Sequence, residues 1–203
     1  MIVIAIGKNY VNAAEEMPTS KGAPVIFTKP ESSVLTGNAP FEIPKAVTNV
    51  AYEVELAFRI NKKGKLIAKE SAMDYVDAVA LAIDFTGKDL LNQTRETKGP
   101  WALAKGFDGA TPLSGFVPLS EITDIHSINF TLDLNGERVQ NGTSMLMIHT
   151  LPEILEYVTQ FMTINPGDVI LTGTPAHGTG FVKPGDQLTA NLNGKELLDF
   201  KVV

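Results

Sequence analysis

Two glutamates one residue apart are the first side chains of this sequence whose spacing suggests chemistry. Glu53 and Glu55 flank Val54 within the apolar run 51–60. Alternate residues of a β-strand point to the same face, so these carboxylates would stand side by side, with Cα atoms about 7 Å apart. Two like charges at that spacing repel unless a cation joins them. The motif alone also fits an edge strand with both glutamates in solvent.

Asp84 is the third carboxylate of interest, because it ends an almost wholly apolar run, 78–83. A carboxylate at the end of a buried strand costs free energy unless it is paired or binds a metal. A helix N-cap, or an ion pair with Lys88 or Lys105, would also satisfy it. If Asp84 joins the two glutamates, three carboxylates in a chain without cysteine make an all-oxygen site suited to Mg²⁺ or Mn²⁺.

Two further segments have the composition of binding-site loops. The segment 101–109 places Lys105 among apolar residues and glycines, which favours a site lysine over an ordinary surface lysine. The segment 171–180 follows a predicted strand and contains Gly173, Thr174 and His177. Its backbone N–H groups and hydroxyls could hold an anion, although a glycine-rich loop is more often a simple turn. It lacks the pattern of a nucleotide-binding P-loop.

The elements that must position these residues are mostly strands. Short runs rich in β-branched and apolar residues predict strands at 1–6, 24–29, 51–60, 76–85, 129–134, 168–172, 187–192 and 196–202. Asn-Gly pairs at 135–136 and 193–194 predict tight hairpins. Thr150 and Glu153 form a capping box before apolar residues at helical spacing, and 71–75 could add a short helical turn. The polar segment 9–23 is expected to be a loop or mobile helix, and the fold class is α+β, rich in β-strands.

Composition excludes several classes of protein. The 203 residues fit one domain, 1–203, with 44% hydrophobic and 20% charged residues. A net charge of −6 argues against nucleic-acid binding through phosphates and against a basic membrane-surface helix. The absence of cysteine excludes disulfides, thiolate metal sites and thiol nucleophiles. No apolar run approaches the roughly 20 residues that span a bilayer, and the apolar start lacks a basic leader, so a cytoplasmic location is expected.

Taken together, the motifs resemble those of the fumarylacetoacetate hydrolase family, in its short form that carries only the catalytic domain. The matching residues, in order, are 7–10, 53–55, 84–89, 101–108 and 171–175. The resemblance implies a mixed β-sandwich roll with few short helices, a homodimer, and a Mg²⁺ or Mn²⁺ site. It also implies action on 2-oxo acids, acylpyruvates or their enols, by C–C hydrolysis, decarboxylation or isomerisation.

The resemblance also implies roles for individual residues. Glu53, Glu55 and Asp84 match the metal ligands, and Lys105 matches a lysine beside the substrate enolate. Thr174, with Gly173 before it, matches the loop that contacts the substrate carboxylate. Lys88 occupies the position at which relatives often have an arginine that binds the substrate.

Departures from the family pattern affect the expected reaction. Hydrolytic members use a histidine and a glutamate to activate water; here Ala13 takes the histidine position, while Glu16 keeps the glutamate position. Leu91 replaces a common glutamine, and the lid looks short. His177 is the one histidine placed to act as a replacement base. We therefore expect a tautomerase, isomerase or decarboxylase, with a C–C hydrolase as the alternative; a non-catalytic 2-oxo acid sensor and a plain interaction module are rivals of other classes.

Overall fold

The computed structural model describes residues 1–203, and strands make up most of its regular structure. The strands are β1 Val3–Gly7, β2 Val25–Lys29, β3 Val34–Leu35, β4 Val50–Tyr52, β5 Val54–Ile60, β6 Val76–Ile83, β7 Thr86–Gly87, β8 Thr111–Pro112, β9 Val117–Pro118, β10 Asn129–Leu134, β11 Glu137–Thr143, β12 Val169–Leu171, β13 Gly180–Phe181, β14 Gln187–Leu192 and β15 Lys195–Lys201. The helices are α1 Lys88–Thr97, α2 Ala102–Lys105 and α3 Leu151–Phe161, with short 3₁₀ turns η1 Ala14–Glu16, η2 Glu31–Ser33, η3 Lys69–Tyr75, η4 Leu119–Glu121, η5 Ile125–Ser127 and η6 Ser144–Leu146.

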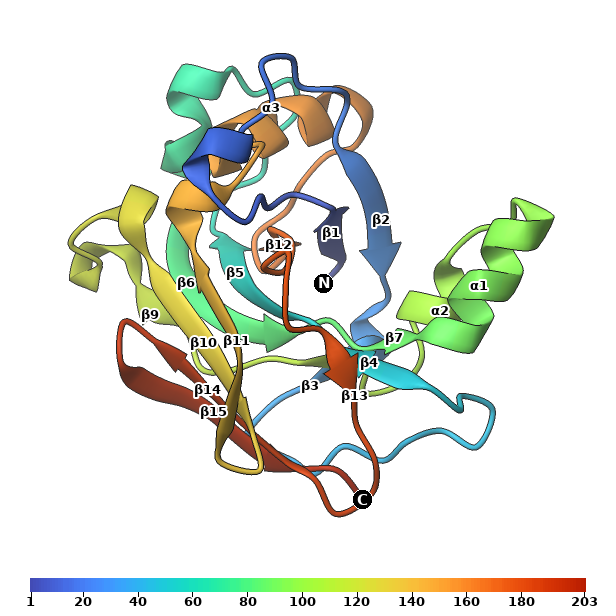
Figure 1. The fold of residues 1–203 in the computed structure, drawn as a ribbon. Helices are drawn as coiled ribbons and strands as arrows, with labels where there is room; N and C mark the ends of the chain where they lie inside the picture. Colours follow the sequence, from blue (N-terminus) through green and yellow to red (C-terminus); the bar gives the residue numbers. More distant parts are fainter.

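A six-stranded sheet, in the order β2-β1-β12-β5-β6-β9, forms the centre of the molecule (Figure 1). Its pairs are antiparallel except for β1 and β12, which run parallel with Val3 opposite Val169. Side chains of both faces are buried: Ile4 and Leu56 belong to the larger core, whereas Val3 and Ala57 belong to a smaller cluster on the opposite face. Burial on both faces explains why these strands are nearly continuous apolar runs.

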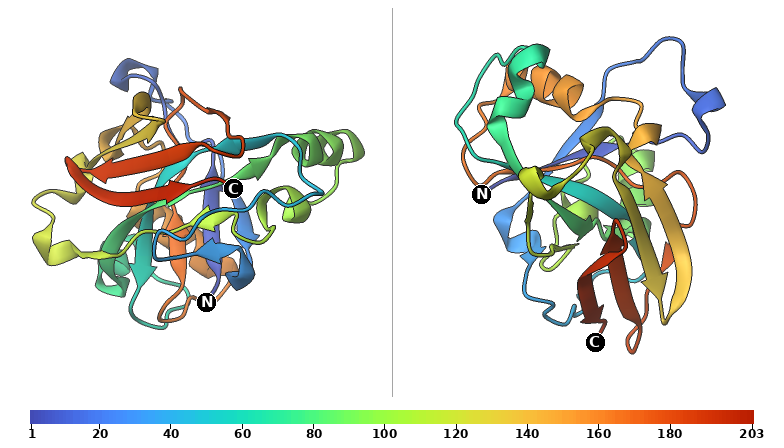
Figure 2. Two further views of the ribbon diagram at one scale, coloured as in Figure 1. Left: turned by 90° about the horizontal axis from the view of Figure 1, so that it is seen from below. Right: turned by 90° about the vertical axis from the view of Figure 1, so that its left-hand side faces the viewer.

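A four-stranded antiparallel sheet, β11-β10-β14-β15, packs against the large sheet (Figure 2). Its two hairpins turn at the Asn-Gly pairs, where Asn135 has φ 53° and Gly136 has φ 82°. Asn193 and Gly194 adopt the same left-handed backbone, with φ 48° and 83°. Both predicted hairpins are therefore confirmed. The first hairpin contains β11, a strand that was not among those predicted.

The β-rich α+β fold class is also confirmed, and α3 begins at the predicted capping box. Helices α1 and α2 were not predicted, because α1 is a polar helix with a single buried residue, Leu91. No helix has both the length and the apolar character needed to cross a membrane.

Some predicted boundaries were wrong. The expected strand 51–60 is interrupted at Glu53, which separates β4 from β5. Strand β6 ends at Ile83, so Asp84 and Phe85 lie just beyond it. The segment 9–23 is a loop with the single 3₁₀ turn η1, and the short helical turn expected at 71–75 is the end of η3.

Candidate metal centre and active site

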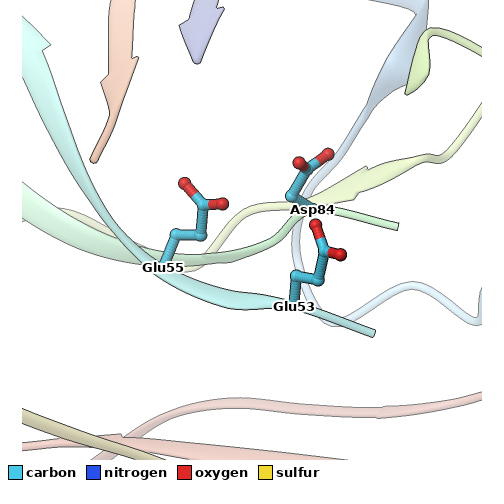
Figure 3. Close-up of side chains that lie close together, drawn as sticks. All are labelled: Glu53, Glu55 and Asp84. Atoms are coloured by element: carbon cyan, nitrogen blue, oxygen red, sulfur yellow. The ribbon is translucent and has the colours of Figure 1, made fainter. Parts of the chain in front are cut away.

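Glu53, Glu55 and Asp84 converge where β5 and β6 meet the loops that flank them. One carboxylate oxygen from each residue lies within 4.8 Å of those of the other two (Figure 3). Asp84 and Glu55 are almost completely buried, with 1% and 3% of their surface exposed. The alternative of an exposed edge strand is thereby excluded for Glu55.

Backbone pairing explains this convergence. Val54 opposes Ile83 as the last residue pair of β5 and β6, and the Asp84 N–H donates to the Glu53 carbonyl at 2.7 Å. Glu53 and Asp84 therefore leave the sheet next to each other. Glu55 lies one pair further along, opposite Ala82. The interruption at Glu53, missed in the sequence, thus helps to bring the three carboxylates together.

Lysines balance this negative charge. The Lys105 ammonium donates to both Glu53, at 2.8 Å, and Asp84, and it lies 5.0 Å from the centre of the Phe27 ring. Lys29 is completely buried and donates to Asp84 at 2.5 Å and to the Ala110 carbonyl at 2.7 Å. Lys88 pairs with Glu53 at 2.8 Å. The ion pair considered for Asp84 therefore exists with Lys105, together with one to Lys29.

The two buried carboxylates respond differently to this environment. Burial raises the pKa of Glu55 well above its usual value, and the neighbouring Asp84 charge raises it further. Burial alone would also raise the pKa of Asp84, but the ammonium groups of Lys105 and Lys29 hold it below its usual value. Among these groups, Glu55 lacks an ammonium partner and accepts only the Gly173 N–H, at 2.7 Å.

This arrangement fits a hard divalent cation. The three oxygens lie close enough to share one ion, and such a cation would relieve the repulsion that raises the pKa of Glu55. The donor set is all oxygen, the kind that Mg²⁺ and Mn²⁺ prefer. Three protein ligands leave coordination positions for water or substrate oxygens.

The triad lies at the buried end of a pocket of about 300 Å³. Phe27, Leu91, Trp101 and Pro175 supply apolar walls. Four cationic side chains also line it: Lys8, Lys88, Arg95 and Lys105. The pocket can therefore enclose a small anion whose carbon skeleton contacts the aromatic walls.

The loop after β12 closes one side of this pocket. Gly173 has φ 97°, and a Cβ there would lie 3.0 Å from the Asn9 Cβ, so glycine is required at this close approach. Its N–H donates to Glu55, whereas Thr174 lines the pocket itself. Asn9 fixes the loop from the other side by donating to the Thr172 carbonyl at 2.9 Å.

Gln140 on β11 connects the two sides of the site, although no motif in the sequence indicates this role. Its carbonyl oxygen accepts the Val54 N–H at 2.9 Å, and its amide donates to the Thr174 hydroxyl at 2.9 Å. The buried Gln140 thus holds Thr174 next to the strand that carries Glu55. Lys29 and Arg95 were also missed, because Lys29 lies 55 residues from Asp84 in the sequence and Arg95 lies on α1, a helix that was not predicted.

Glu16 and His177 lie outside the pocket lining. Glu16 is exposed on η1, where it accepts hydrogen bonds from the Asn12 N–H and side-chain amide, both at 3.1 Å. The segment that carries η1 projects away from the body of the molecule (Figure 2, right). His177 has an exposed side chain, although its carbonyl accepts the Gln140 amide at 3.4 Å. Their catalytic roles stay predictions.

Comparison with known proteins decides the family. The family model described as fumarylacetoacetate (FAA) hydrolase C-terminal matches residues 2–203. The chain belongs to the fumarylacetoacetate hydrolase family. The resemblance drawn from the motifs is thereby confirmed, and the protein is an enzyme of this metal-binding family.

Curated relatives and solved structures agree with this assignment. The mitochondrial oxaloacetate tautomerase FAHD1 of Bos taurus is 37% identical over 98% of this chain and 90% of its own. The mitochondrial oxaloacetate decarboxylase of Dictyostelium discoideum is 38% identical over 95% and 88%. Fumarylpyruvate hydrolase of Pseudomonas aeruginosa, solved with Mn²⁺ and pyruvate, has a TM-score of 0.90 and 30% identity, covering 100% of this chain and 89% of that one.

Proposed function

We propose that this protein is a divalent-metal-dependent enzyme that interconverts the keto and enol forms of a 2-oxo diacid such as oxaloacetate. Decarboxylation would be a related activity, because loss of CO₂ leaves the enolate of pyruvate, with its negative charge on the same 2-oxo oxygen. One observation carries the proposal: three converging carboxylates and a buried lysine ammonium share one pocket with a loop hydroxyl. The oxaloacetate tautomerase and decarboxylase among the curated relatives support it.

Glu53, Glu55 and Asp84 would hold the metal, which when bound acts as a Lewis acid that stabilises negative charge on a 2-oxo oxygen. The buried Gly173 N–H orients Glu55, and Lys29 orients Asp84. These two contacts fix both carboxylates in rotamers that face the pocket. A ligand set positioned in this way loses little conformational entropy when a cation binds.

Lys105 would stabilise the enolate oxygen. Its ammonium is held by Glu53 and Asp84, and 5% of the residue is exposed. Burial lowers the pKa of a lysine, but the two carboxylates raise that of Lys105 above its usual value, so it stays charged at neutral pH. A fixed positive charge in a water-poor pocket stabilises a developing oxyanion more strongly than one in solvent.

Thr174 and Lys88 would bind the substrate carboxylate. The Thr174 hydroxyl accepts the Gln140 amide, so its own proton is free to donate to a ligand. Lys88 keeps 28% of its side chain exposed while it pairs with Glu53, so its ammonium has further donors for an anion. Together they would orient the planar 2-oxo acid against the triad.

Proton transfer at C3 is assigned to Glu16, acting when the η1 segment closes over the pocket. Tyr10 also lines the pocket, but burial raises its pKa, so its phenol stays protonated and cannot serve as the base. Ala13 has no proton to transfer, so water activation by a histidine and glutamate pair is absent here. Enolate chemistry needs no activated water, which is why we favour it over C–C hydrolysis.

The test follows oxaloacetate in D₂O by NMR with Mg²⁺ or with Mn²⁺ at trace levels, together with release of pyruvate and hydrolysis of acetylpyruvate. We expect deuterium uptake at C3 to be faster than either decarboxylation or hydrolysis. Rapid acetylpyruvate hydrolysis without faster exchange would favour the hydrolase alternative, for which the fumarylpyruvate hydrolase structure is the precedent. Binding without any reaction would instead favour a 2-oxo acid sensor.

Two substitutions separate the candidate bases. Glu16→Gln should abolish C3 exchange if this carboxylate moves the proton, whereas His177→Ala should leave it unchanged. The reverse result would assign the proton to the loop histidine.

Four further properties remain predictions: magnesium as the native metal, a homodimer, a single catalytic domain over 1–203 and a cytoplasmic location. The FAHD1 relatives are mitochondrial proteins by name.

A further inference from the structure

Arg95 is the one arginine of this chain without a carboxylate partner. Arg59 pairs with Asp77 at 2.8 Å, and Arg138 pairs with Asp133. The Arg95 side chain makes no ion pair or hydrogen bond, yet it lines the pocket that contains the metal-ligand triad. A guanidinium presents several N–H donors in a plane that matches a carboxylate, so this group is free to bind one.

The helix geometry directs Arg95 into the pocket. Lys88, Leu91 and Arg95 are three and four residues apart on α1, so they share one helix face, and all three line the pocket. Lys88 contacts Glu53 at the buried end, whereas Arg95 lies in the last turn and is exposed. The face therefore runs from the metal-ligand end to the pocket mouth, with apolar Leu91 between two cations.

The excess of positive over negative side chains in the pocket lining indicates that an anion binds at the pocket mouth. At the buried end, Lys88 and Lys105 pair with Glu53 and Asp84 inside the pocket. Arg95 and Lys8, also exposed and unpaired, remain as excess positive charge in the lining. A substrate with one carboxylate at the triad end would leave these two groups unused.

We propose that Arg95, assisted by Lys8, is a specificity-determining residue that binds the second carboxylate of a dicarboxylic 2-oxo acid. The inference rests on the proposed function and deepens it, because it states which part of the substrate the pocket mouth recognises. Leu91 and the aromatic wall would contact the carbons between the two carboxylates.

The experiment compares oxaloacetate with its 4-methyl ester, in which a neutral methyl ester replaces the distal carboxylate. Turnover is measured as deuterium exchange at C3, with added Mg²⁺, for the wild type, Arg95→Met and Arg95→Lys. We expect Arg95→Met to lower kcat/KM for oxaloacetate by at least about 10-fold and for the ester by less than about 2-fold. Arg95→Lys keeps the charge but not the planar donors, so it should lose less.

Lys98→Met is the matched control, because Lys98 is an exposed cation at the end of α1 that does not line the pocket. It should leave both substrates unchanged. An equal loss for Lys98→Met and Arg95→Met would mean that the helix only attracts anions at long range, and would overturn the proposal. Equal losses for oxaloacetate and its ester in Arg95→Met would overturn it as well.

Calorimetry of the same ligand pair separates this inference from the proposed function. If the wild type binds oxaloacetate more tightly than the ester, and Arg95→Met removes the difference, the second-carboxylate site stands even without turnover. If the wild type turns both compounds over but binds them equally, the tautomerase assignment survives and the role of Arg95 is wrong. Failure to bind either ligand would reject both.

Discussion

The Lys105 ammonium donates hydrogen bonds to both Glu53 and Asp84, so its charge contributes to the chemistry of the site and to the stability of the fold. Lys105→Met keeps the length of the side chain and removes the ammonium. We expect kcat to fall by about 10²–10³-fold, the usual cost of removing one donor to an oxyanion. Steady-state kinetics measures the fall, and metal-dependent thermal stabilisation should persist in the variant. Lys63→Met, an exposed lysine outside the pocket, should change neither quantity.

Asp84 illustrates why the three carboxylates are not equivalent for folding. Asp84→Asn removes the carboxylate partner of Lys29, an ammonium with no solvent exposure. We expect the free energy of unfolding to fall by about 3–5 kcal/mol, since an unpaired buried charge remains. Urea titration of metal-free protein measures this loss. Glu53→Gln should lose less than half as much, because the Glu53 side chain is 14% exposed.

A double variant checks the cause of that loss. Lys29→Met removes the buried ammonium, so Lys29→Met combined with Asp84→Asn should be more stable than Asp84→Asn alone. If the double variant is less stable, the loss does not come from the unpaired ammonium.

Glu153 connects three segments of the chain through its carboxylate. Its carboxylate accepts the Thr150 N–H at 2.9 Å, as the capping box predicts, and pairs with Lys21 at 2.8 Å and Lys69 at 2.9 Å. The helix α3 is thereby joined to the segment that follows η1 and to η3. Burial alone would raise the pKa of Glu153, but the hydrogen bonds from Lys21, Lys69 and Thr150 lower it to about 2.

This lowered pKa predicts a pH dependence of stability. Because the folded protein binds this proton less readily than the unfolded chain, the stabilisation is present above pH 4.5, the ordinary value, and is lost as the pH falls towards 2. We expect a contribution of about 1–2 kcal/mol after solvent screening. Urea unfolding at pH 6 and pH 3 should show a smaller difference in Glu153→Gln than in the wild type. The exposed control Glu121→Gln should keep the full difference.

The sequence predicted those elements whose signal is local. Asn-Gly turns and a capping box act over four residues, and the apolar strands are buried whatever their partners are. Helix α1 carries no such signal, because it is polar and buries only Leu91. The triad could be predicted because Glu53 and Glu55 are two residues apart in one apolar run and Asp84 ends another. Lys29 and Gln140 meet the site only through contacts between segments far apart in the chain, and Arg95 does so through the unpredicted helix α1.

A metal bound to the triad would connect β5 with the end of β6, and through Glu55 with the loop whose Gly173 N–H donates to that carboxylate. A ligand that binds only the folded state stabilises it by about 2.7 kcal/mol at 100 times its Kd. For a chain of this size we expect Mn²⁺ to raise Tm by roughly 5–10 °C. Glu53→Gln should fold and show no shift in differential scanning fluorimetry. If neither Mn²⁺ nor Mg²⁺ changes the Tm of the wild type, that result would contradict the metal site.

The parallel pairing of β1 with β12 has a consequence for how the chain is made. Val3 leaves the ribosome well before its partner Val169, because the strands between them are synthesised in the interval. At about 5–20 residues per second, that interval is on the order of 10–30 s. Throughout it, β1 and β2 can pair with each other but not with the rest of the sheet. Strand β1 therefore waits with an unpaired edge, and the pocket cannot assemble until the loop after β12, which supplies Thr174 and Pro175, has been synthesised.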